Sequence, residues 1–520
     1  MQLESFLEAS ARRWPEKTAV VCGKQRWTYA QIESAANRLA HALIGRGIER
    51  GDRVAIHLDN SVEAVVSVFA VLKAGAVFMM VNPTTKSQKL TYILNNSRAR
   101  AIILPARKFA AHESCWHETP HLDLAIGTGE AKDVELPEPK TCLSFEQLIE
   151  TCPHHEPPAK RAIDVDLAAL VYTSGSTGNP KGVMLTHVNM VSAATSITTY
   201  LENTPDDIIL NVLPLAFDYG LYQVLMALKV GATVILERSF AYPHAVMKRL
   251  IEERVTGFPV VPTMVAMLLQ MDLSNYDLSH LRYVTNTGAA LPANHIGQLR
   301  QLLPDVSIYS MYGLTECKRV SYLPPDQIDV RPNSVGRGMP NEEVYLVDHD
   351  GRRVGPETVG ELVVRGSNVM KGYWELPEET DRMLRPGPLP GEKVLFTGDL
   401  FRADDEGYLY FVGRKDDMIK SRGEKVSPKE VENVLHDHPA VAEAAVVGVP
   451  DKVLGQAVKA VIVPRGEDEL SQRQVLQHCA QRLEDFMVPQ IVEFRDALPR
   501  TKNGKIDKRE LQQQPVGVTT

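Results

Sequence analysis

Residues 171–183 read VYTSGSTGNPKGV, a run that combines glycines, hydroxyl side chains and one lysine. Glycines let the backbone approach a polyphosphate closely, hydroxyls donate hydrogen bonds, and Lys181 neutralises negative charge. The run therefore predicts a loop that binds the β- and γ-phosphates of ATP. It is not a Walker loop, because Gly182 stands where that pattern requires Ser or Thr. A surface linker rich in Ser and Gly is the alternative, and it fits a shorter match better than this one.

The TSGSTGNPKG part of this run resembles the signature of the adenylate-forming superfamily. That superfamily comprises acyl-CoA synthetases, the adenylation domains of nonribosomal peptide synthetases, and luciferases. The resemblance extends over nearly the whole chain, and it implies an enzyme that uses ATP and Mg²⁺ to activate a carboxylic acid. The acid becomes an acyl-AMP with release of pyrophosphate, and a thiol then takes the acyl group. The resemblance assigns the phosphates to Thr173, Ser174, Gly175, Ser176, Thr177, Gly178 and Lys181.

The segment SMYGLTE, which ends at Glu316, resembles the YGxTE element of the superfamily. The resemblance implies that Tyr312, followed by Gly313, offers an aromatic face to adenine. It places the hydroxyl of Thr315 near the α-phosphate and makes Glu316 an oxygen ligand of Mg²⁺. Alone, this short motif would be more typical of a turn before a helix. Its position after the phosphate loop favours the catalytic interpretation.

Two more segments resemble the parts of the superfamily that hold the nucleoside. In the turn TNTGAALP, small residues let adenine lie against bare backbone, and the resemblance assigns this contact to Gly288, Ala289 and Ala290. In TGDL at residues 397–400, Asp399 matches the carboxylate that accepts hydrogen bonds from both ribose hydroxyls. A small-residue turn or a surface Asp is ordinary when it stands alone, so both assignments depend on the other motifs.

Two matches near the C-terminus complete the set. The run GRKDDMIKSRGEKVSPKEVE resembles the hinge between two domains, in which Arg414 approaches the ribose or a phosphate and Asp416 is the pivot. In PRTKNGKIDK, Lys505 stands for the lysine that bridges the substrate carboxylate and the α-phosphate. Because negative charge builds on both groups as they react, a cation between them stabilises the transition state more than the ground state. The resemblance implies that the small domain then rotates and withdraws Lys505 before the thiol attacks.

The segment LPLAFDYGLYQVLMALKVGA aligns without gaps to the version in amino-acid-activating members, which places Asp218 where they hold the substrate ammonium. A carboxylate in a small apolar site is costly unless a cation meets it, so a zwitterionic substrate would explain Asp218. The alternative is that Asp218 caps a helix that starts at Tyr219. By the same alignment, the side-chain pocket consists of Tyr219, Tyr222, Pro259, Thr285, Thr287, Met311, Arg319 and Val320.

These residues indicate a small, mostly apolar amino acid, and the YGLTECKRVSYLPP context resembles free-standing prolyl adenylating enzymes. The main hypothesis is activation of L-proline and its transfer to the phosphopantetheine thiol of a separate carrier protein in secondary metabolite biosynthesis. Arg319 departs from an apolar pocket, and it either points out to a neighbouring carboxylate or recognises an acidic substrate. Segments such as LKAGAVFMMVNP and SVGRGMPNEEVYLVD look more like acyl-CoA ligases than peptide-synthetase modules.

Two other classes stay open. An acyl- or aryl-CoA ligase would activate a non-amino carboxylic acid and use coenzyme A as the acceptor. A non-catalytic relative that binds nucleotide as a regulator is disfavoured, because Lys181, Glu316, Asp399 and Lys505 are all present. The sequence contains no serine-bearing GGxS-like segment of a carrier domain, so we expect the acceptor thiol to belong to another molecule.

Helix-like segments alternate with short apolar runs between residues 27 and 340, which is typical of an α/β domain with parallel strands. Residues 101–160 are richer in Pro, His and Glu, and we interpret them as surface insertions around one strand. VYLVD, GELVVRG and GYLYFVG predict a separate small β-sheet, and the chain after GRKDD predicts a small α+β domain. The predicted domains are 1–413 for ATP and acid binding, 414–418 as the hinge, and 419–520 as a mobile lid that carries the catalytic lysine.

The composition excludes several classes of protein. A chain of 520 residues is too long for one ordinary core, and 44% hydrophobic with 23% charged residues is typical of a globular protein. A net charge of −8 gives no basic field for nucleic acid. Six well-separated cysteines form no CxxC pair, which predicts reduced thiols in a cytoplasm. We expect no signal peptide and no membrane partner, because no apolar stretch has the required length.

Overall fold

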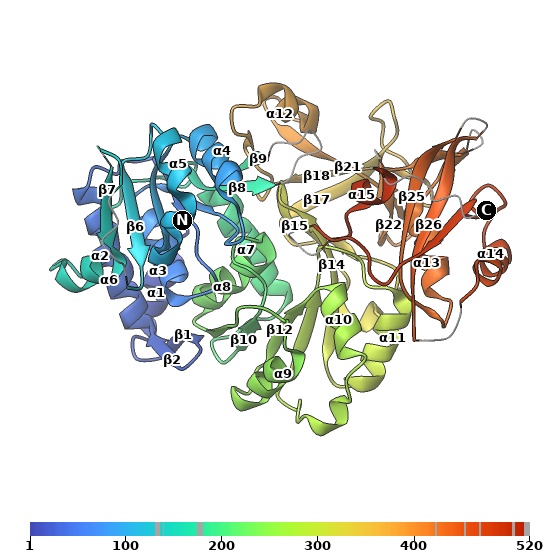
Figure 1. The fold of residues 1–520 in the computed structure, drawn as a ribbon, viewed down its shortest axis with the longest axis horizontal. Coiled ribbons are helices and arrows are strands. Elements are labelled where there is room, and N and C mark those ends of the chain that lie inside the picture. The colour runs from blue at the N-terminus through green and yellow to red at the C-terminus, as the bar shows by residue number, and fades with distance from the viewer. Residues whose placement is uncertain are drawn as a thin grey trace.

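The computed structural model describes residues 1–130, 136–138, 140–173, 180–415, 417–421, 424–451, 454–466, 470–501 and 505–513. Within these residues the chain forms four β-sheets with helices packed between and around them (Figure 1). Three sheets belong to a large N-terminal part, and the fourth belongs to a smaller C-terminal part. The prediction of a layered α/β domain with a small β-subdomain, followed by a small α+β domain, is confirmed.

The first sheet has the strand order β19-β9-β8-β4-β3-β5-β6-β7, in which β8 to β7 are parallel and β9 and β19 are antiparallel. Its strands are β3 (Arg53–Ile56), β4 (Val77–Met80), β5 (Ala99–Pro105), β6 (Leu124–Thr128), β7 (Thr141–Ser144), β8 (Leu167–Thr173), β9 (Lys181–Thr186) and β19 (Gly372–Tyr373). Our interpretation of residues 101–160 as surface insertions around one strand is wrong. Strands β6 and β7 extend the sheet, and β6 is buried although the flanking segments are polar.

The second sheet has the order β16-β15-β14-β13-β12-β10-β11-β1-β2 and is parallel from β14 to β1. Its strands are β1 (Thr18–Cys22), β2 (Gln25–Thr28), β10 (Ile208–Asn211), β11 (Thr233–Leu236), β12 (Gly257–Val260), β13 (Tyr283–Asn286), β14 (Ser307–Leu314), β15 (Cys317–Tyr322) and β16 (Arg337–Gly338). The carboxyl ends of β12, β13 and β14 meet at one edge, which is where ligands bind in open α/β sheets.

Helices cover both parallel sheets. They are α1 (Ser5–Arg13), α2 (Tyr29–Gly45), α3 (Val62–Lys73), α4 (Ser87–Ser97), α5 (Glu113–Glu118), α6 (Phe145–Thr151), α7 (His187–Tyr200), α8 (Asp218–Val230), α9 (Pro243–Glu252), α10 (Pro262–Leu268), α11 (Ala293–Leu302) and α12 (Pro377–Met383). Short 3₁₀ turns occur at Ala106–Lys108, Ala110–His112, Leu273–Asn275 and Pro325–Gln327. Helix α3 is apolar almost all round, because it packs between β3 and β4 of the first sheet and β1 of the second.

The third sheet is small and antiparallel, with the order β17-β18-β21-β20 and β22 paired to β21. Its strands are β17 (Glu342–Val347), β18 (Gly360–Gly366), β20 (Leu384–Pro386), β21 (Lys393–Ala403) and β22 (Leu409–Arg414). The predicted strands VYLVD, GELVVRG and GYLYFVG correspond to β17, β18 and β22. This sheet shares its apolar core with the two parallel sheets.

The C-terminal part has its own sheet, in the order β24-β23-β26-β25 with β27 beside β26. Its elements are β23 (Ile419–Ser421), β24 (Glu424–Val426), α13 (Pro428–His436), β25 (Val441–Asp451), β26 (Gly455–Pro464), α14 (Gln472–Ala480), β27 (Ile491–Phe494) and α15 (Lys508–Gln513). Two apolar clusters cover the two faces of this sheet and contain no residue of the N-terminal part. A separate core of this kind is what a domain that moves as a unit requires.

The C-terminal part lies against the end of the second and third sheets, with α13 close to α11 (Figure 1). The side-chain amide of Asn294 on α11 donates to the carbonyl of His436 on α13, with 3.1 Å between N and O. Near the hinge, Lys415 Nζ lies 3.0 Å from Glu361 Oε2, and the hydroxyl of Ser427 donates to the carbonyl of Val412. These contacts are polar, which is typical of an interface between two domains of one chain. None of the described helices combines the length and the apolar character that a bilayer span needs.

Candidate active site

The β8–β9 hairpin carries the predicted phosphate loop. Thr173, the last residue of β8, pairs with Lys181, the first residue of β9, so the two strands close the base of the loop. The predicted phosphate ligands between them lie outside the described residues; these are Ser174, Gly175, Ser176, Thr177 and Gly178. Their assignment stays a prediction, whereas the position of Lys181 is fixed by the antiparallel pairing.

Lys181 is connected to Glu316 through one aromatic side chain. The ammonium of Lys181 lies 5.6 Å from the ring centroid of Tyr373, and the hydroxyl of Tyr373 donates to Glu316 Oε1 over 2.6 Å. Strand β19 places Tyr373 there, because it pairs with Val183 on β9. The structure therefore brings the predicted phosphate-binding lysine and the predicted magnesium ligand to the same place.

A second carboxylate meets Lys181 from the other side. Glu379 on α12 accepts from Lys181 Nζ over 2.6 Å, and this hydrogen bond lowers the pKa of Glu379. Sequence reasoning missed both Glu379 and Tyr373. The MKGYW run could have indicated Tyr373, but nothing local marks Glu379, which lies 198 residues from its partner. A polyphosphate that binds Lys181 must take the place that the Glu379 carboxylate holds here.

Asp399 on β21 is a buried carboxylate between an aromatic hydroxyl and a guanidinium. Tyr312 donates its hydroxyl to Asp399 Oδ2 over 2.5 Å, and Arg414 Nε lies 3.3 Å from Oδ1. Burial raises the pKa of Asp399, while the positive charges of Arg414 and Lys505 oppose that rise. Asp399 Oδ1 has no hydrogen-bond partner, so it is free to accept one from a ligand hydroxyl. These features fit the predicted contact with ribose.

Lys505 comes from the C-terminal part and lies within electrostatic reach of the N-terminal site. The Thr501 amide donates to the Lys505 carbonyl over 2.7 Å. The Lys505 side chain is exposed. Burial is the main cause of the raised pKa of Asp399 and of the lowered pKa of Lys318, and the charge of Lys505 opposes the first shift and adds to the second. The placement of Lys505 between the acid and the α-phosphate stays a prediction. Asp416, the predicted pivot, lies outside the described residues.

The predicted adenine turn follows β13. Gly288 has a φ of +88°, a backbone conformation that glycine adopts without strain, and the side-chain amide of Asn286 donates to the carbonyl of Ala289 over 3.0 Å. Ala290 follows in the same turn. The small residues therefore stand at the carboxyl end of a central strand, in the place where the open sheet favours a ligand.

Thr315 and Glu316 form the turn between β14 and β15, which places them next to Tyr312 and Gly313 at the end of β14. The Glu316 carbonyl accepts from the Met370 amide over 2.8 Å, which ties this turn to the segment before β19. A hydroxyl and a carboxylate on one turn are the hard oxygen donors that suit Mg²⁺. When bound, Mg²⁺ would neutralise charge on the phosphates.

The predicted acid pocket is assembled from four elements. Tyr219 on α8 donates its hydroxyl to the Thr285 carbonyl over 2.7 Å, and Thr285 pairs with Pro259 on β12. All the predicted pocket residues are buried, namely Tyr219, Tyr222, Pro259, Thr285, Thr287, Met311, Arg319 and Val320. The predicted pocket residues on α8, β12 and β13 therefore lie next to one another. Met311, Arg319 and Val320 come from the β14–β15 hairpin.

Asp218, the residue expected to hold a substrate ammonium, already has a cation. Lys318 Nζ lies 3.2 Å from Asp218 Oδ1, and both side chains are buried. Burial lowers the pKa of Lys318 to about 7, and the charge of Asp218 opposes that fall. The capping alternative for Asp218 is not what the structure has, because α8 begins at Asp218 and its N-cap, Phe217, makes no side-chain cap. Sequence reasoning missed Lys318, which lies beside the noted Arg319.

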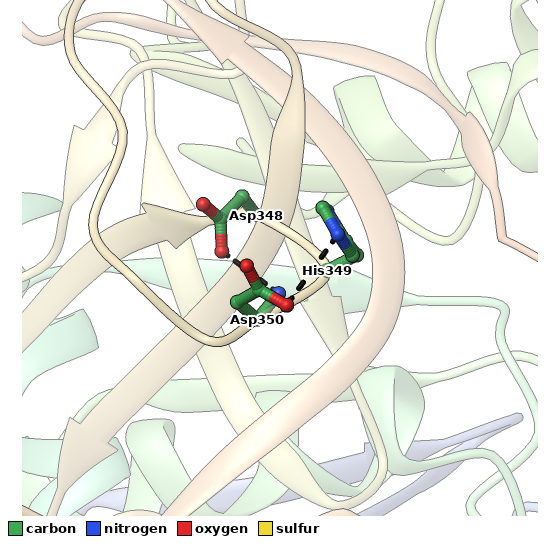
Figure 2. A group of neighbouring side chains, drawn as sticks. All are labelled: Asp348, His349 and Asp350. Carbon is green, nitrogen blue, oxygen red and sulfur yellow. Dashed lines mark hydrogen bonds and ion pairs between the residues drawn. The ribbon is translucent and has the colours of Figure 1, made fainter.

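One more group of potential metal ligands lies outside this site. Asp348, His349 and Asp350 lie in the turn after β17, and their ligand atoms are within 4.8 Å of one another (Figure 2). Asp348 Oδ1 accepts the backbone amides of Asp350 and Arg352, both over 2.9 Å, which accounts for its position by turn formation. His349 and Asp350 are exposed. We assign no metal to this turn.

The fold, and the connection of Lys181 to Glu316 through Tyr373, are those expected of an adenylate-forming enzyme. Residues 7–374 match the family described as AMP-binding enzyme, and residues 430–505 match the AMP-binding enzyme C-terminal domain. The chain belongs to this family. It is an AMP-forming acid–thiol ligase that uses ATP and Mg²⁺, and its reaction is adenylation followed by thioesterification.

Three relatives illustrate the similarity. A long-chain-fatty-acid–CoA ligase of Bacillus subtilis (strain 168) is 31% identical over 544 residues, covering 98% of this chain and 94% of the relative. A feruloyl-CoA synthase of Amycolatopsis sp is 34% identical over 513 residues, covering 98% of each chain. The crystal structure of the anthranilate CoA ligase AuaEII in complex with anthranoyl-AMP superposes with a TM-score of 0.89 at 29% identity, covering 98% of this chain and 96% of that one.

Proposed function

We propose that this protein is an acyl- or aryl-CoA ligase (AMP-forming) that activates a carboxylic acid without an amino group. The observation that carries the proposal is the buried ion pair between Asp218 and Lys318, at 3.2 Å. To bind Asp218, a substrate ammonium would have to displace Lys318 from its ion pair. Lys318 would then stay buried without a partner, which is costly. The similarity to fatty-acid and feruloyl CoA ligases supports the same choice over activation of proline.

The reaction has two steps on this site. A carboxylate oxygen of the acid attacks the α-phosphorus of ATP, the bond to the β-phosphate oxygen breaks, and pyrophosphate leaves. In the second step the thiol of coenzyme A gives its proton to solvent, its sulfur attacks the acyl carbonyl, and the bond from that carbon to the phosphate oxygen breaks, so that AMP leaves with the electron pair. The chain mainly positions the reactants and neutralises charge.

Individual residues take the following proposed roles. Lys181 binds the β- and γ-phosphates, and Asp399 accepts hydrogen bonds from the ribose hydroxyls, with Tyr312 and Arg414 holding its carboxylate in place. Lys505 lies between the acid carboxylate and the α-phosphate during adenylation. We further infer that residues 1–413 form the adenylation domain, 414–418 the hinge, and 419–520 the lid that rotates between the steps, which agrees with the separate apolar core of the C-terminal part.

ATP–pyrophosphate exchange tests this proposal. Purified enzyme is given MgATP, labelled pyrophosphate and single acids from three groups: fatty acids, aromatic acids, and free amino acids together with their N-acetyl derivatives. We expect exchange with acids from the first two groups and background rates with free amino acids, because Lys318 already neutralises Asp218. Active acids should then yield a CoA thioester when coenzyme A is added, measured by mass spectrometry.

The same panel contains the result that would overturn the proposal. Exchange with free proline, together with no exchange with N-acetylproline, would mean that the site requires a substrate ammonium. A phosphopantetheinylated carrier protein replaces coenzyme A in a parallel reaction, and acylation of that carrier alone would reject coenzyme A as the acceptor.

A further inference from the structure

Arg319 on β15 is a fully buried arginine, and two of its guanidinium nitrogens lack hydrogen-bond partners. Its side chain is only 1% exposed, and its Nε and Nη1 atoms make no hydrogen bond. Across the part of the chain that the structure describes, no carboxylate lies within ion-pair distance of it. A buried charge without a partner is strongly destabilising, and native proteins pair such groups or bind something to them. The missing partner of Arg319 is therefore to be sought in a ligand.

Two tyrosines lie near Arg319, and their hydroxyls already form hydrogen bonds with other groups. Its guanidinium carbon lies 5.0 Å from the ring centroid of Tyr219. The hydroxyl of Tyr219 is used by Thr285, and that of Tyr200 donates to the sulfur of Met311 over 3.0 Å. Both hydroxyls donate their protons to these partners, and neither oxygen accepts a hydrogen bond from Nε or Nη1 of Arg319. The positive charge of Arg319 opposes the rise in the pKa of both tyrosines that burial causes.

The carboxylate of Asp218 does not serve Arg319. Lys318 lies 5.4 Å from the same Tyr219 ring and is paired with Asp218. Among the described residues, the Arg319 guanidinium is thus left without a carboxylate of its own. An incoming anion would neutralise this charge, whereas a neutral group would only satisfy hydrogen bonds.

The cluster adjoins the place where the acid must react. Lys318 is within electrostatic reach of Lys505, the lysine proposed to contact the reacting carboxylate, and Arg319 follows Lys318 in the chain. Arg319 also lies among the residues of the predicted acid pocket, because it contacts Tyr219 and precedes Val320 on β15. An acid held with one end at Lys505 would have its remainder among these residues.

Resting on the acid–CoA ligase function proposed above, we propose that the substrate carries a second carboxylate, which Arg319 binds while the first one reacts. The planar guanidinium presents two N–H groups in the geometry of a carboxylate, so it pairs bidentately with one. A carboxylate binds either the edge formed by Nε and Nη2 or the edge formed by Nη1 and Nη2, so either pairing gives a partner to one of the two nitrogens, Nε and Nη1, that lack one. The enzyme accordingly activates one end of a dicarboxylic acid and leaves the other end as a free carboxylate in the CoA thioester.

Matched acids test this inference with the wild-type enzyme. ATP–pyrophosphate exchange is measured with adipate, its monomethyl ester, its monoamide and hexanoate, and with terephthalate, its monomethyl ester and benzoate. Each set keeps the reacting carboxylate and changes only the distal group. We expect kcat/KM for the better diacid to exceed that of its ester and amide by about 100-fold, because a site built for a charged partner rejects analogues that leave its groups unpaired.

Two variants of Arg319 and one control variant test whether Arg319 causes the preference for a diacid. Arg319→Met removes the guanidinium at similar volume, and the diacid should then lose its advantage while the monoacid gains. Arg319→Lys keeps the charge without the fork and should keep part of the preference. Arg282→Met is the control, since Arg282 already has its ion pair with Asp207 at 2.9 Å; it should leave the order of the acids unchanged. Thermal unfolding of each variant shows whether it is folded.

The outcomes separate this inference from the proposed function. Equal or better use of the monoacids, esters or amides by the wild-type enzyme, with CoA thioesters formed, would overturn the second carboxylate and leave the ligase function standing. Exchange with none of the non-amino acids, or with free amino acids alone, would overturn the proposed function itself. If Arg319→Met does not fold, the wild-type acid series still decides the matter, because it needs no variant.

Discussion

Replacing Lys505 with alanine is expected to slow adenylation by about 1,000-fold and to leave the transfer of the acyl group from preformed acyl-AMP to coenzyme A largely unchanged. The charge of Lys505 contributes to the electrostatic environment of Asp399 and Lys318, which agrees with the role that we propose for it in adenylation. The thioester step needs no cation between a carboxylate and the α-phosphate. Pyrophosphate exchange measures the first step, and thioester formation from synthetic acyl-AMP measures the second.

Lys508→Ala is the matched control for this experiment. Lys508 lies three residues further along the chain and already pairs with Glu432 over 2.6 Å. Its removal should affect both steps little. Equal loss of both steps in Lys505→Ala would contradict the role that we assign to Lys505, because it would indicate damage to the fold or a lysine that serves both reactions.

Replacing Asp399 with alanine is expected to raise KM for ATP by about 100-fold. The carboxylate is buried, is held by Tyr312 and Arg414, and has one oxygen without a hydrogen-bond partner. Two hydrogen bonds from ribose hydroxyls to a charged acceptor account for a loss of about 3 kcal/mol, which corresponds to that factor. Initial rates of pyrophosphate exchange against ATP concentration give KM, and titration with ATP followed by calorimetry gives the affinity.

Two further variants bracket this effect. Tyr312→Phe removes only the hydroxyl that donates to Asp399, so it should raise KM for ATP by about tenfold or less. Asp404→Ala removes a carboxylate just after β21 that pairs with Arg331 at 3.2 Å, and KM should not change. An Asp399→Ala enzyme that remains folded and keeps the wild-type KM for ATP would remove Asp399 from the nucleotide site.

The sequence alone predicts the parts of this site that lie in short, contiguous motifs. Lys181, Glu316 and Asp399 belong to runs of four to ten residues, and the structure connects the first two through Tyr373. The layered α/β fold and the separate C-terminal domain follow from hydrophobic periodicity, because alternating helices and buried strands leave a regular pattern.

The partners of those residues could not be predicted in the same way. Glu379 meets Lys181 from a helix 198 residues away, and Lys318 meets Asp218 from a strand 100 residues further along the chain. Such pairs depend on how distant parts of the chain pack together, and a local sequence pattern does not predict that packing. The prediction of an ammonium partner for Asp218 was reasonable for a lone buried carboxylate, and the fold supplies a cation from within the chain.

Polar flanks explain the error at residues 101–160. The strands there are short, and β6 and β7 are separated by a segment rich in Pro and Glu that resembles a surface loop. Their place at the edge of the first sheet allows one side of β7 to be partly exposed, so the usual run of buried apolar residues is missing.

The central claim is that a carboxylate attacks the α-phosphorus of ATP on this site, and isotope transfer tests it most directly. The acid that gives the fastest exchange is labelled with ¹⁸O in its reacting carboxylate, mixed with enzyme, MgATP and coenzyme A, and the nucleotide and phosphate products are weighed by mass spectrometry. We predict one ¹⁸O atom in AMP and none in pyrophosphate. Label in inorganic phosphate, with ADP as the nucleotide product, would mean an acyl phosphate and would contradict the account.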